Sequence, residues 1–232
     1  ANGATKYKIG SISKTFTATM MMQLVEEKKI LLSTKLNRFF PKIDQSDKIT
    51  IEHLLYQRTG LKDYANADST LTDVLGKPNT KELVLKKIEN YTSIFEPDTK
   101  HEYSNSNYFI LGLIIEKITK KSYAENLKTR ISDKLQLKNT YYTNEKTDIS
   151  KRESFSYMFN GENWEKIDEW NNDIAFSSGG IISTPEDLTK FIRSLFKGNL
   201  VSPASLELMK TLKDTYGMAL ISFPIGERKF YS

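Results

Sequence analysis

The stretch YKIGSISKTFTATMMMQLVEEKK, residues 7–29, decides how the fold is interpreted. Residues 5–9 predict a short strand, Gly10 interrupts it, and residues 11–28 predict a helix. The apolar side chains of this helix spread beyond a single stripe, so we expect it to be buried on several sides. Ser11 and Lys14 stand three positions apart at its start, a spacing that places two side chains on one helical face.

Two interpretations of Ser11 and Lys14 are open at this point. Ser11 is a preferred N-cap residue, and Lys14 would then be an ordinary solvated lysine. Alternatively, the free N–H groups and positive dipole end of a helix stabilise a developing oxyanion, and burial favours the neutral amine that accepts a serine proton. The spacing alone does not decide, because Ser194 and Lys197 repeat it in the last turn of another predicted helix.

A possible third group for the same site is the Tyr-x-Asn pattern at Tyr103 and Asn105, directly before an apolar helix predicted over residues 108–120. A phenol beside a lysine can relay a proton or be held as a phenolate, and an amide can orient a substrate carbonyl. The same pattern at Tyr64 falls in residues 61–80, which are rich in Asp, Asn, Ser and Gly and predict a loop. We therefore favour the pattern at Tyr103.

Composition excludes several classes of function. A hydrophobic content of 38% and a charged content of 27% are typical of globular domains, and no apolar run reaches the length that spans a membrane. The net charge of +5 comes from scattered lysines rather than from a basic stripe with interleaved aromatics, so we predict no nucleic-acid partner. The absence of cysteine excludes disulfides and thiol catalysis.

The chain contains two histidines, His53 and His101, so a Ser-His-Asp arrangement can form in few ways. His53 lies on a predicted apolar helix and is interpreted as structural. His101 lies two residues before Tyr103, and no metal-binding spacing such as H-E-x-x-H occurs. If the protein is a hydrolase, its base is predicted not to be histidine.

The remaining elements are mostly helices with clear start signals. Thr50 and Thr184 are predicted N-caps, the second followed by a proline at the first helical position. Loosely alternating aromatics predict short strands or surface loops over residues 141–173, and a hairpin with the turn PIGE is predicted near the end. Strands near both ends of the chain predict one antiparallel sheet that pairs the first strand with the last. The further predicted helices are residues 51–57, 81–90, 123–135, 185–197 and 203–212.

Four stretches in order resemble the serine penicillin-recognising enzymes of the class C β-lactamase and DD-peptidase type, a superfamily that also contains esterases and D-aminopeptidases. YKIGSISKTFTATMMMQLVEEKKILLSTKLNRFFP (residues 7–41) is similar to the family's nucleophile helix, and KITIEHLLYQRTGL (residues 48–61) to its ITIxHLLxHTSGL stretch. YSNSNYFILGLIIEKITKKSY (residues 103–123) resembles its Tyr-x-Asn block, and SSGGIISTPEDLTKFIRSLF (residues 177–196) its Gly-Gly turn and following helix.

The resemblance implies roles for four residues. Ser11 would be the acylated nucleophile, Lys14 its general-base partner, Tyr103 the proton relay for acylation and deacylation, and Asn105 a ligand of the substrate amide. No metal or organic cofactor is implied. The implied function is a serine hydrolase acting on D-amino-acid peptides, β-lactams or related amides and esters. The alternatives are a non-hydrolytic homologue used for binding or scaffolding and a carboxylesterase of the same fold.

The resemblance also implies the fold and the location. We expect an α/β (α+β) two-lobed architecture in which an antiparallel sheet flanked by helices joins an all-helical lobe, about residues 45–175, within a single β-lactamase-like transpeptidase domain over residues 1–232. We expect substrates that are small molecules or peptidoglycan-type peptides, and an exported protein of the periplasm or cell envelope.

One departure from the family pattern concerns the third motif, Lys-Thr-Gly or His-x-Gly. These 232 residues contain neither. The family's N-terminal helix and first strands have no counterpart before Ala1 either, so we interpret the chain as truncated at both ends.

Overall fold

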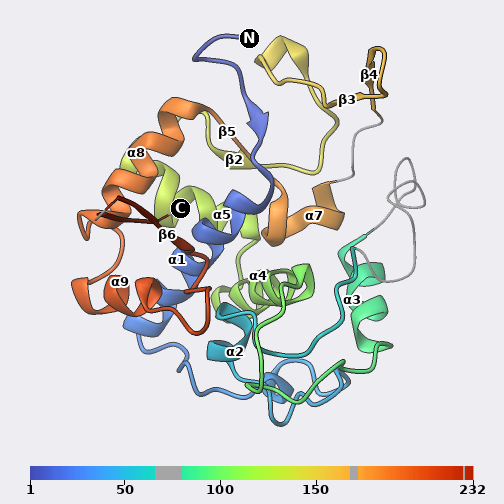
Figure 1. Cartoon of the computed structure of the whole chain (residues 1–232), viewed down its shortest axis with the longest axis vertical. Helices are drawn as coiled ribbons and strands as arrows, with labels where there is room; N and C mark the ends of the chain where they lie inside the picture. The colour runs from blue at the N-terminus through green and yellow to red at the C-terminus, as the bar shows by residue number, and fades with distance from the viewer. Residues whose placement is uncertain (66–79, 168–171, 227, 232) are drawn as a thin grey trace.

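The computed structural model describes residues 1–65, 80–167, 172–226 and 228–231. Its helices gather around α1 (Ser13–Glu26), which runs through the middle of the molecule beside α4 (Asn105–Thr119) and α7 (Asn172–Gly179) (Figure 1). All residues of α1 up to Leu24 are buried. The predicted burial of this helix on several sides is therefore confirmed.

The start of α1 differs from the prediction. Ser11 lies in η1 (Gly10–Ile12), one turn of 3-10 helix, and the α-helix proper begins two residues later. Gly10 adopts a φ of +53°, a left-handed conformation that glycine reaches without steric cost. This turn separates the preceding strand from α1 and leaves Ser11 exposed where the two elements meet.

The central sheet has three short antiparallel strands in the order β1 (Tyr7–Lys8), β5 (Ile181–Ser183) and β2 (Tyr141–Tyr142). The prediction that the first strand pairs with the last is wrong. The partner of β1 is β5, a fully buried three-residue strand that is too short for its periodicity to be recognised. Ile9 extends the pairing by donating its N–H to the Ile181 carbonyl at 3.0 Å.

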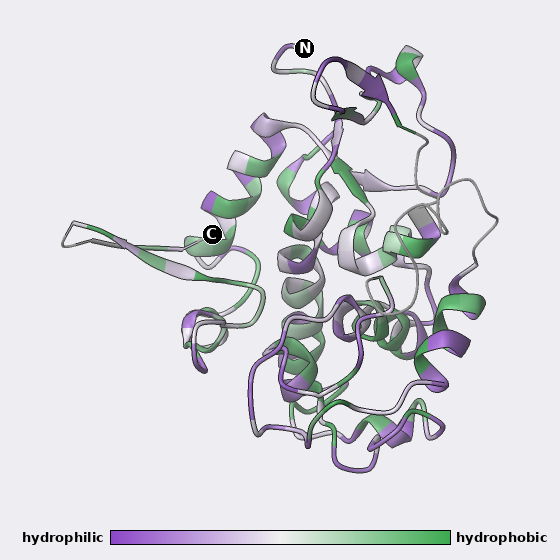
Figure 2. Cartoon of the chain, turned by 45° about the vertical axis from the view of Figure 1, so that its right-hand side comes forward, coloured by the Kyte–Doolittle hydropathy of each residue, from purple (hydrophilic) through white to green (hydrophobic). Residues whose placement is uncertain are grey.

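Two hairpins stand apart from this sheet. One is formed by β3 (Tyr157–Phe159) and β4 (Trp164–Lys166), and the other by β6 (Ser222–Ile225) and β7 (Arg228–Tyr231). The second confirms the predicted hairpin, although its first strand begins at residue 222 rather than 216. It projects from the helices next to the C-terminus (Figure 2).

β2, β3 and β4 lie within residues 141–173, where short strands or surface loops are predicted, and so also within the stretch of about residues 45–175 that was assigned to the helical lobe. The predicted helix over residues 123–135 is confirmed as one uninterrupted helical run, whose middle turn, η4 (Lys128–Ser132), is π-helical. The division of a single domain into two lobes stays a prediction. The remaining elements are η2 (Leu36–Arg38), α2 (Ile51–Leu55), α3 (Lys81–Glu89), α5 (Tyr123–Leu127), η4 (Lys128–Ser132), α6 (Asp133–Leu135), η5 (Ile149–Lys151), α8 (Pro185–Phe196) and α9 (Pro203–Lys210).

The predicted caps are present and fix where the helices begin. Thr50 and His53 form a reciprocal capping box at the start of α2, in which the His53 N–H donates to the Thr50 hydroxyl at 3.2 Å and the Thr50 N–H donates to His53 Nδ1 at 3.3 Å. This confirms that His53 is structural. Thr184 caps α8 by accepting the N–H of Asp187, as predicted.

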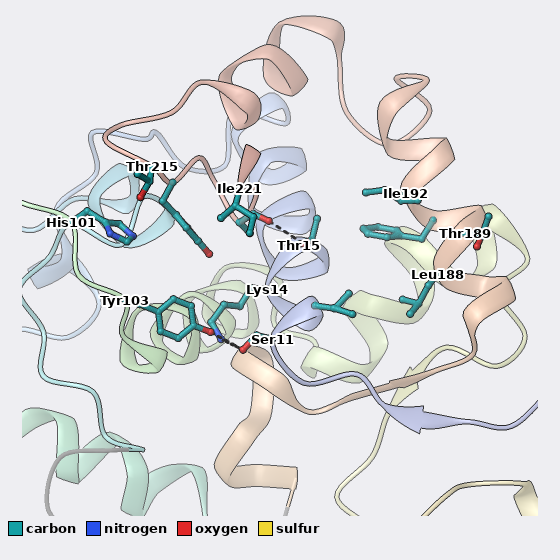
Figure 3. Close-up of a pocket in the computed structure, with 14 residues that line it drawn as sticks. Ser11, Lys14, Thr15, His101, Tyr103, Leu188, Thr189, Ile192, Thr215 and Ile221 are labelled. Atoms are coloured by element: carbon teal, nitrogen blue, oxygen red, sulfur yellow. Dashed lines mark hydrogen bonds between the residues drawn. The ribbon is translucent and has the colours of Figure 1, made fainter. Parts of the chain in front are cut away.

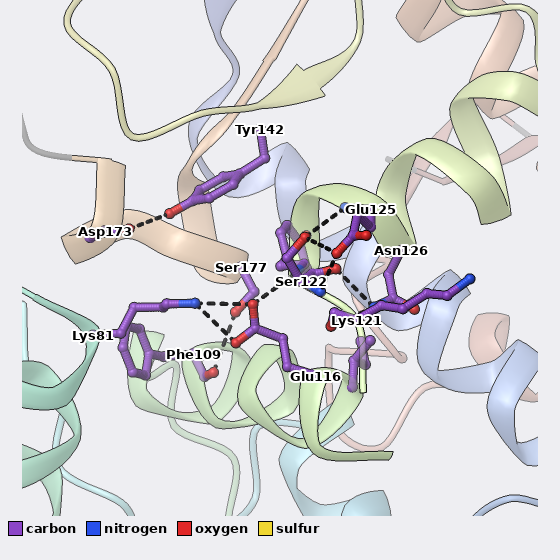
Figure 4. A network of polar contacts seen from close by, with 12 residues as sticks. Lys81, Phe109, Glu116, Lys121, Ser122, Glu125, Asn126, Tyr142, Asp173 and Ser177 are labelled. Atoms are coloured by element: carbon purple, nitrogen blue, oxygen red, sulfur yellow. Dashed lines mark hydrogen bonds and ion pairs between the residues drawn. The ribbon is translucent and has the colours of Figure 1, made fainter. Parts of the chain in front are cut away.

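A partly buried ion pair between α3 and α4 lies in a network of polar contacts that also reaches α5 (Figure 4). Lys81, the first residue of α3, contacts both carboxylate oxygens of Glu116 on α4 at 3.0 Å. Glu116 also accepts the N–H of Tyr123 at 2.8 Å and so fixes the start of α5. The Lys81 ammonium lies 4.6 Å from the ring centre of Phe176, which connects the ion pair to α7.

Within the residues that the structure describes, no helix is both long enough and apolar enough to cross a membrane.

Candidate active site

Three side chains meet where η1 passes the start of α4 (Figure 3). The Ser11 and Tyr103 hydroxyls lie 2.6 Å apart, and Lys14 Nζ lies 3.1 Å from Ser11 Oγ. Ser11 and Tyr103 are 92 positions apart in sequence, so only the packing of α1 against α4 brings them together. The structure thus unites the serine, lysine and tyrosine that the sequence singled out.

Lys14 is almost completely buried, with 2% of its surface exposed. Its Nζ makes two further hydrogen bonds besides that to Ser11, to Asn105 Oδ1 at 2.9 Å and to the Ser178 carbonyl at 2.8 Å. Burial disfavours the charged amine and lowers the pKa of Lys14 from 10.5 to about 7, against the opposing effect of the Asp63 charge. At neutral pH the amine is therefore present in both protonation states.

The two protonation states of Lys14 differ in what they do to Ser11. As an ammonium, Lys14 has three N–H donors for its three neighbours and holds Ser11 Oγ as an acceptor. As a neutral amine, it has a lone pair that accepts the Ser11 proton while the other two acceptors stay bound. Only the neutral form can therefore take a proton from Ser11.

Tyr103 completes the arrangement at the mouth of the site, where it is 41% exposed. Burial of the rest of the side chain raises the pKa of Tyr103, and the hydrogen bond with Ser11 opposes that effect. Of the two roles open to this phenol, proton relay and phenolate base, the raised pKa favours the relay. Lys14 Nζ lies 4.8 Å from the centre of the Tyr103 ring. The Lys14 amine and the Tyr103 hydroxyl both contact Ser11 Oγ.

Asn105 is the first residue of α4, and both ends of its amide are bound within the protein. Its Oδ1 accepts from Lys14, and its Nδ2 donates to Asp63 Oδ2 at 3.1 Å. An amide nitrogen carries two N–H groups, so a second donor exists for a substrate carbonyl, the role that the resemblance implies. Asp63 was not among the predicted site residues, because residues 61–80 have the composition of a loop.

The Ser178 carbonyl reaches Lys14 because α7 is kinked at Phe176. The backbone of Phe176 adopts a φ of 37°, a strained conformation for a residue with a side chain. The close approach of α7 to α4 requires Gly112, since a Cβ there would lie 2.0 Å from Ser177 Oγ. This contact and the kink direct the carbonyl ends of α7 toward α1, where Ser177 accepts from the Thr17 hydroxyl at 2.8 Å.

A cavity of about 750 Å³ opens beside Ser11 (Figure 3). Lys14, Tyr103 and His101 line it on the polar side, and His101 stacks on Tyr216 with ring centres 5.2 Å apart. The opposite wall is apolar and comes mainly from α8, whose contributions include Leu188, Phe191 and Ile192. Ser11 thus borders a cavity that has an apolar wall and a few polar side chains, which is typical of a small-molecule site.

The other sequence candidates lie away from the reacting groups or support them. Ser194 lies on α8 and Lys197 is exposed at its end, as predicted. Tyr64, which was assigned to a polar loop, is buried. Its hydroxyl donates to the Ile174 carbonyl and lies 3.1 Å from Ser178 Oγ. Asn66, the amide residue of this second Tyr-x-Asn pattern, lies outside the described residues. The residues that the structure describes contain no cluster of three or more side chains that could hold a metal ion.

Comparison with known proteins shows the family of the chain. The Beta-lactamase family matches residues 1–220 of the chain. This protein belongs to the Beta-lactamase family. It has the β-lactamase and penicillin-binding protein fold, which confirms the resemblance drawn from the sequence.

Two kinds of relative are informative. The teichoic acid D-alanine hydrolase of Staphylococcus aureus is 29% identical over 205 residues, which cover 86% of this chain and 48% of that protein. The chain therefore spans about half the length of this curated relative. The D-amino acid amidase of Ochrobactrum anthropi SV3, solved with L-phenylalanine amide, superposes with a TM-score of 0.89 at 26% identity and covers 100% of this chain and 70% of the amidase. A D-stereospecific amidohydrolase from Streptomyces gives a TM-score of 0.84 at 26% identity, over 95% of this chain and 72% of that protein.

Proposed function

We propose that the protein is a serine hydrolase that forms an acyl-enzyme on Ser11 from amides or esters of D-amino acids. Lys14 accepts the Ser11 proton as the serine attacks the substrate carbonyl. Tyr103 then gives its proton to the leaving amine or alcohol and takes up the proton that Lys14 received from Ser11, so that both carriers return to their starting state. Water releases the acyl group in a second step through the same proton carriers, which regenerates Ser11.

The observation that carries this proposal is the contact of one exposed serine with a buried lysine and a phenol. A serine hydroxyl is a weak nucleophile until a base removes its proton, and a lysine with a pKa of about 7 is matched to that task at neutral pH. Lys197, by contrast, is solvated beside Ser194. Burial of the lysine, rather than its spacing from the serine, supports catalysis at Ser11.

The substrate class is inferred from two supports. The relatives act on D-alanyl teichoic acid and on D-amino-acid amides, by the names of those proteins, and they share the fold. The cavity beside Ser11 joins an apolar wall to a polar edge, which suits an amino acid with an apolar side chain. We therefore favour a D-amino-acyl group over a β-lactam ring as the acyl donor.

The direct test is to identify the residue that becomes acylated. Full-length protein is incubated with a fluorescent penicillin and, separately, with an activated ester of D-phenylalanine, and the adduct is located by peptide mass spectrometry. We expect the adduct on Ser11, its loss in Ser11→Ala, and no change in Ser194→Ala, the matched Ser-x-x-Lys control.

Each result of this experiment bears on a stated alternative. An adduct elsewhere than Ser11 contradicts the proposal, and no adduct with either probe favours a binding or scaffolding homologue. Hydrolysis of simple L- and D-esters at equal rates, with no action on D-amino-acid amides, indicates instead a carboxylesterase of the same fold.

A further inference from the structure

Asp63 lies in the segment that follows α2, and its carboxylate is aimed at the start of α4. Its Oδ1 accepts the backbone N–H of Asn105 at 3.2 Å and that of Ala65 at 3.1 Å, and its Oδ2 accepts from Asn105 Nδ2 at 3.1 Å. The same carboxylate therefore accepts hydrogen bonds from both the backbone and the side chain of Asn105. This fixes both the position and the rotation of the amide.

We propose that Asp63 is a positioning residue for acyl transfer, because its carboxylate holds the Asn105 amide in the orientation that presents oxygen, not nitrogen, to Lys14. The claim that Asp63 assists catalysis rests on the proposed function. The claim that Asp63 orients the Asn105 amide does not, because that orientation is a property of the folded protein.

The chemistry of the three groups allows only this orientation. A carboxylate accepts hydrogen bonds and does not donate them, so it binds the NH2 end of the amide. The oxygen must then face Lys14, which donates to it at 2.9 Å. With the amide reversed, its NH2 would face the Lys14 N–H groups and its oxygen would face the carboxylate, so both contacts would become repulsive.

Asp63 also acts on Lys14 through its charge. Among the described groups, Lys14 faces the rings of Tyr103 and Tyr108 from the α4 side and the Ser178 carbonyl from α7, with Ser11 before it and His101 lining the same cavity. Asp63 is the charge that raises the pKa of Lys14 against the larger effect of burial. The carboxylate therefore keeps the lysine pKa near neutrality instead of lower.

Replacing Asp63 with asparagine tests both effects. The new side chain has a similar shape, but it carries no charge and offers an NH2 group where one oxygen stood, so the Asn105 amide loses its preferred orientation. We expect the maximal acylation rate to fall about 10- to 100-fold, a loss of the size known for hydrogen-bond partners that orient metal-ligating side chains. We also expect the pKa of Lys14 to move further down.

Two measurements on the full-length protein separate these effects. The pKa of Lys14 is followed by NMR of protein with isotope-labelled lysine, in which the Lys14 signal is the one absent from Lys14→Met. The acylation rate of Ser11 by the D-phenylalanine ester is measured over the same pH range. Asp44→Asn is the matched control, because Asp44 also accepts a backbone N–H, from Ser93 at 2.8 Å, and does not line the cavity.

The outcomes distinguish this inference from the proposed function. An unchanged or raised Lys14 pKa in Asp63→Asn overturns the electrostatic part, and a maximal rate equal to wild type overturns the positioning part. If the wild-type protein is never acylated, the proposed function is refuted. If the Lys14 pKa is nevertheless lower in Asp63→Asn than in wild type, the influence of Asp63 on Lys14 still holds. If Asp63→Asn does not fold, Asp63→Glu tests the positioning role instead. It keeps the charge on a longer side chain, so the Lys14 pKa should stay near wild type while the rate falls, and a wild-type rate would overturn the positioning role.

Discussion

Lys14→Met is expected to lower the rate of Ser11 acylation by about 10²- to 10⁴-fold, the usual contribution of a general base. Methionine has a similar length and an apolar end, so it fills the buried position without supplying a lone pair. The Ser11 hydroxyl then keeps its proton when it meets a substrate carbonyl. The measurement is the pseudo-first-order rate of adduct formation with the D-phenylalanine ester, followed by intact-protein mass spectrometry.

The matched control is Lys197→Met, which removes the exposed lysine of the second Ser-x-x-Lys pair. It should acylate at the wild-type rate. A Lys14→Met protein that is acylated as fast as wild type would remove Lys14 from the mechanism. Circular dichroism of both variants verifies that any loss of rate arises in a folded protein.

The second large effect concerns stability. The pKa of Lys14 is about 7 in the folded state, below the 10.5 of an exposed lysine. Between these two pH values the unfolded chain binds more protons at this residue than the folded chain, so the free energy of unfolding rises with pH. The contribution of Lys14 is about 1.4 kcal/mol per pH unit across this window. Below pH 7 both states are protonated and the contribution to the slope disappears.

Comparison with Lys14→Met isolates this contribution, because other groups titrate in both proteins. Urea unfolding of each at pH 7.5, 8.5 and 9.5 should give a difference, wild type minus variant, that grows by about 1.4 kcal/mol per pH unit. Lys197→Met again serves as the control and should show no such trend against wild type. A difference that stays constant over this range would mean that burial does not perturb Lys14.

Much of the site was predictable from local patterns. Ser11, Lys14, Tyr103 and Asn105 each lie at the start of a buried helix, and a sequence shows such positions through apolar runs and turn residues. The structure places these four side chains within hydrogen-bonding distance of one another in a chain of contacts. Their catalytic roles remain proposals.

The groups that the sequence did not reveal act through long-range packing. The Ser178 carbonyl is a backbone atom, and it reaches Lys14 through a kink at Phe176 and a close contact at Gly112, neither of which leaves a periodic signal. Asp63 follows a short helix in a stretch with loop composition, where an aspartate is expected in any case. The partner of β1 was missed for a related reason, since three buried residues are too few to show a strand period.

The central claim, that a buried neutral lysine activates Ser11, is tested most directly by the pH dependence of the acylation rate in the wild-type protein. The raised pKa of Tyr103 keeps the phenol protonated over the range of interest, and burial lowers the pKa of His101, which lines the same cavity, so the lysine should control the rate near pH 7. We predict a rate that rises through a midpoint near pH 7 and is level by pH 9, in line with the pKa of Lys14. A rate that is constant between pH 5 and 9, or that falls as Lys14 loses its proton, would contradict the claim.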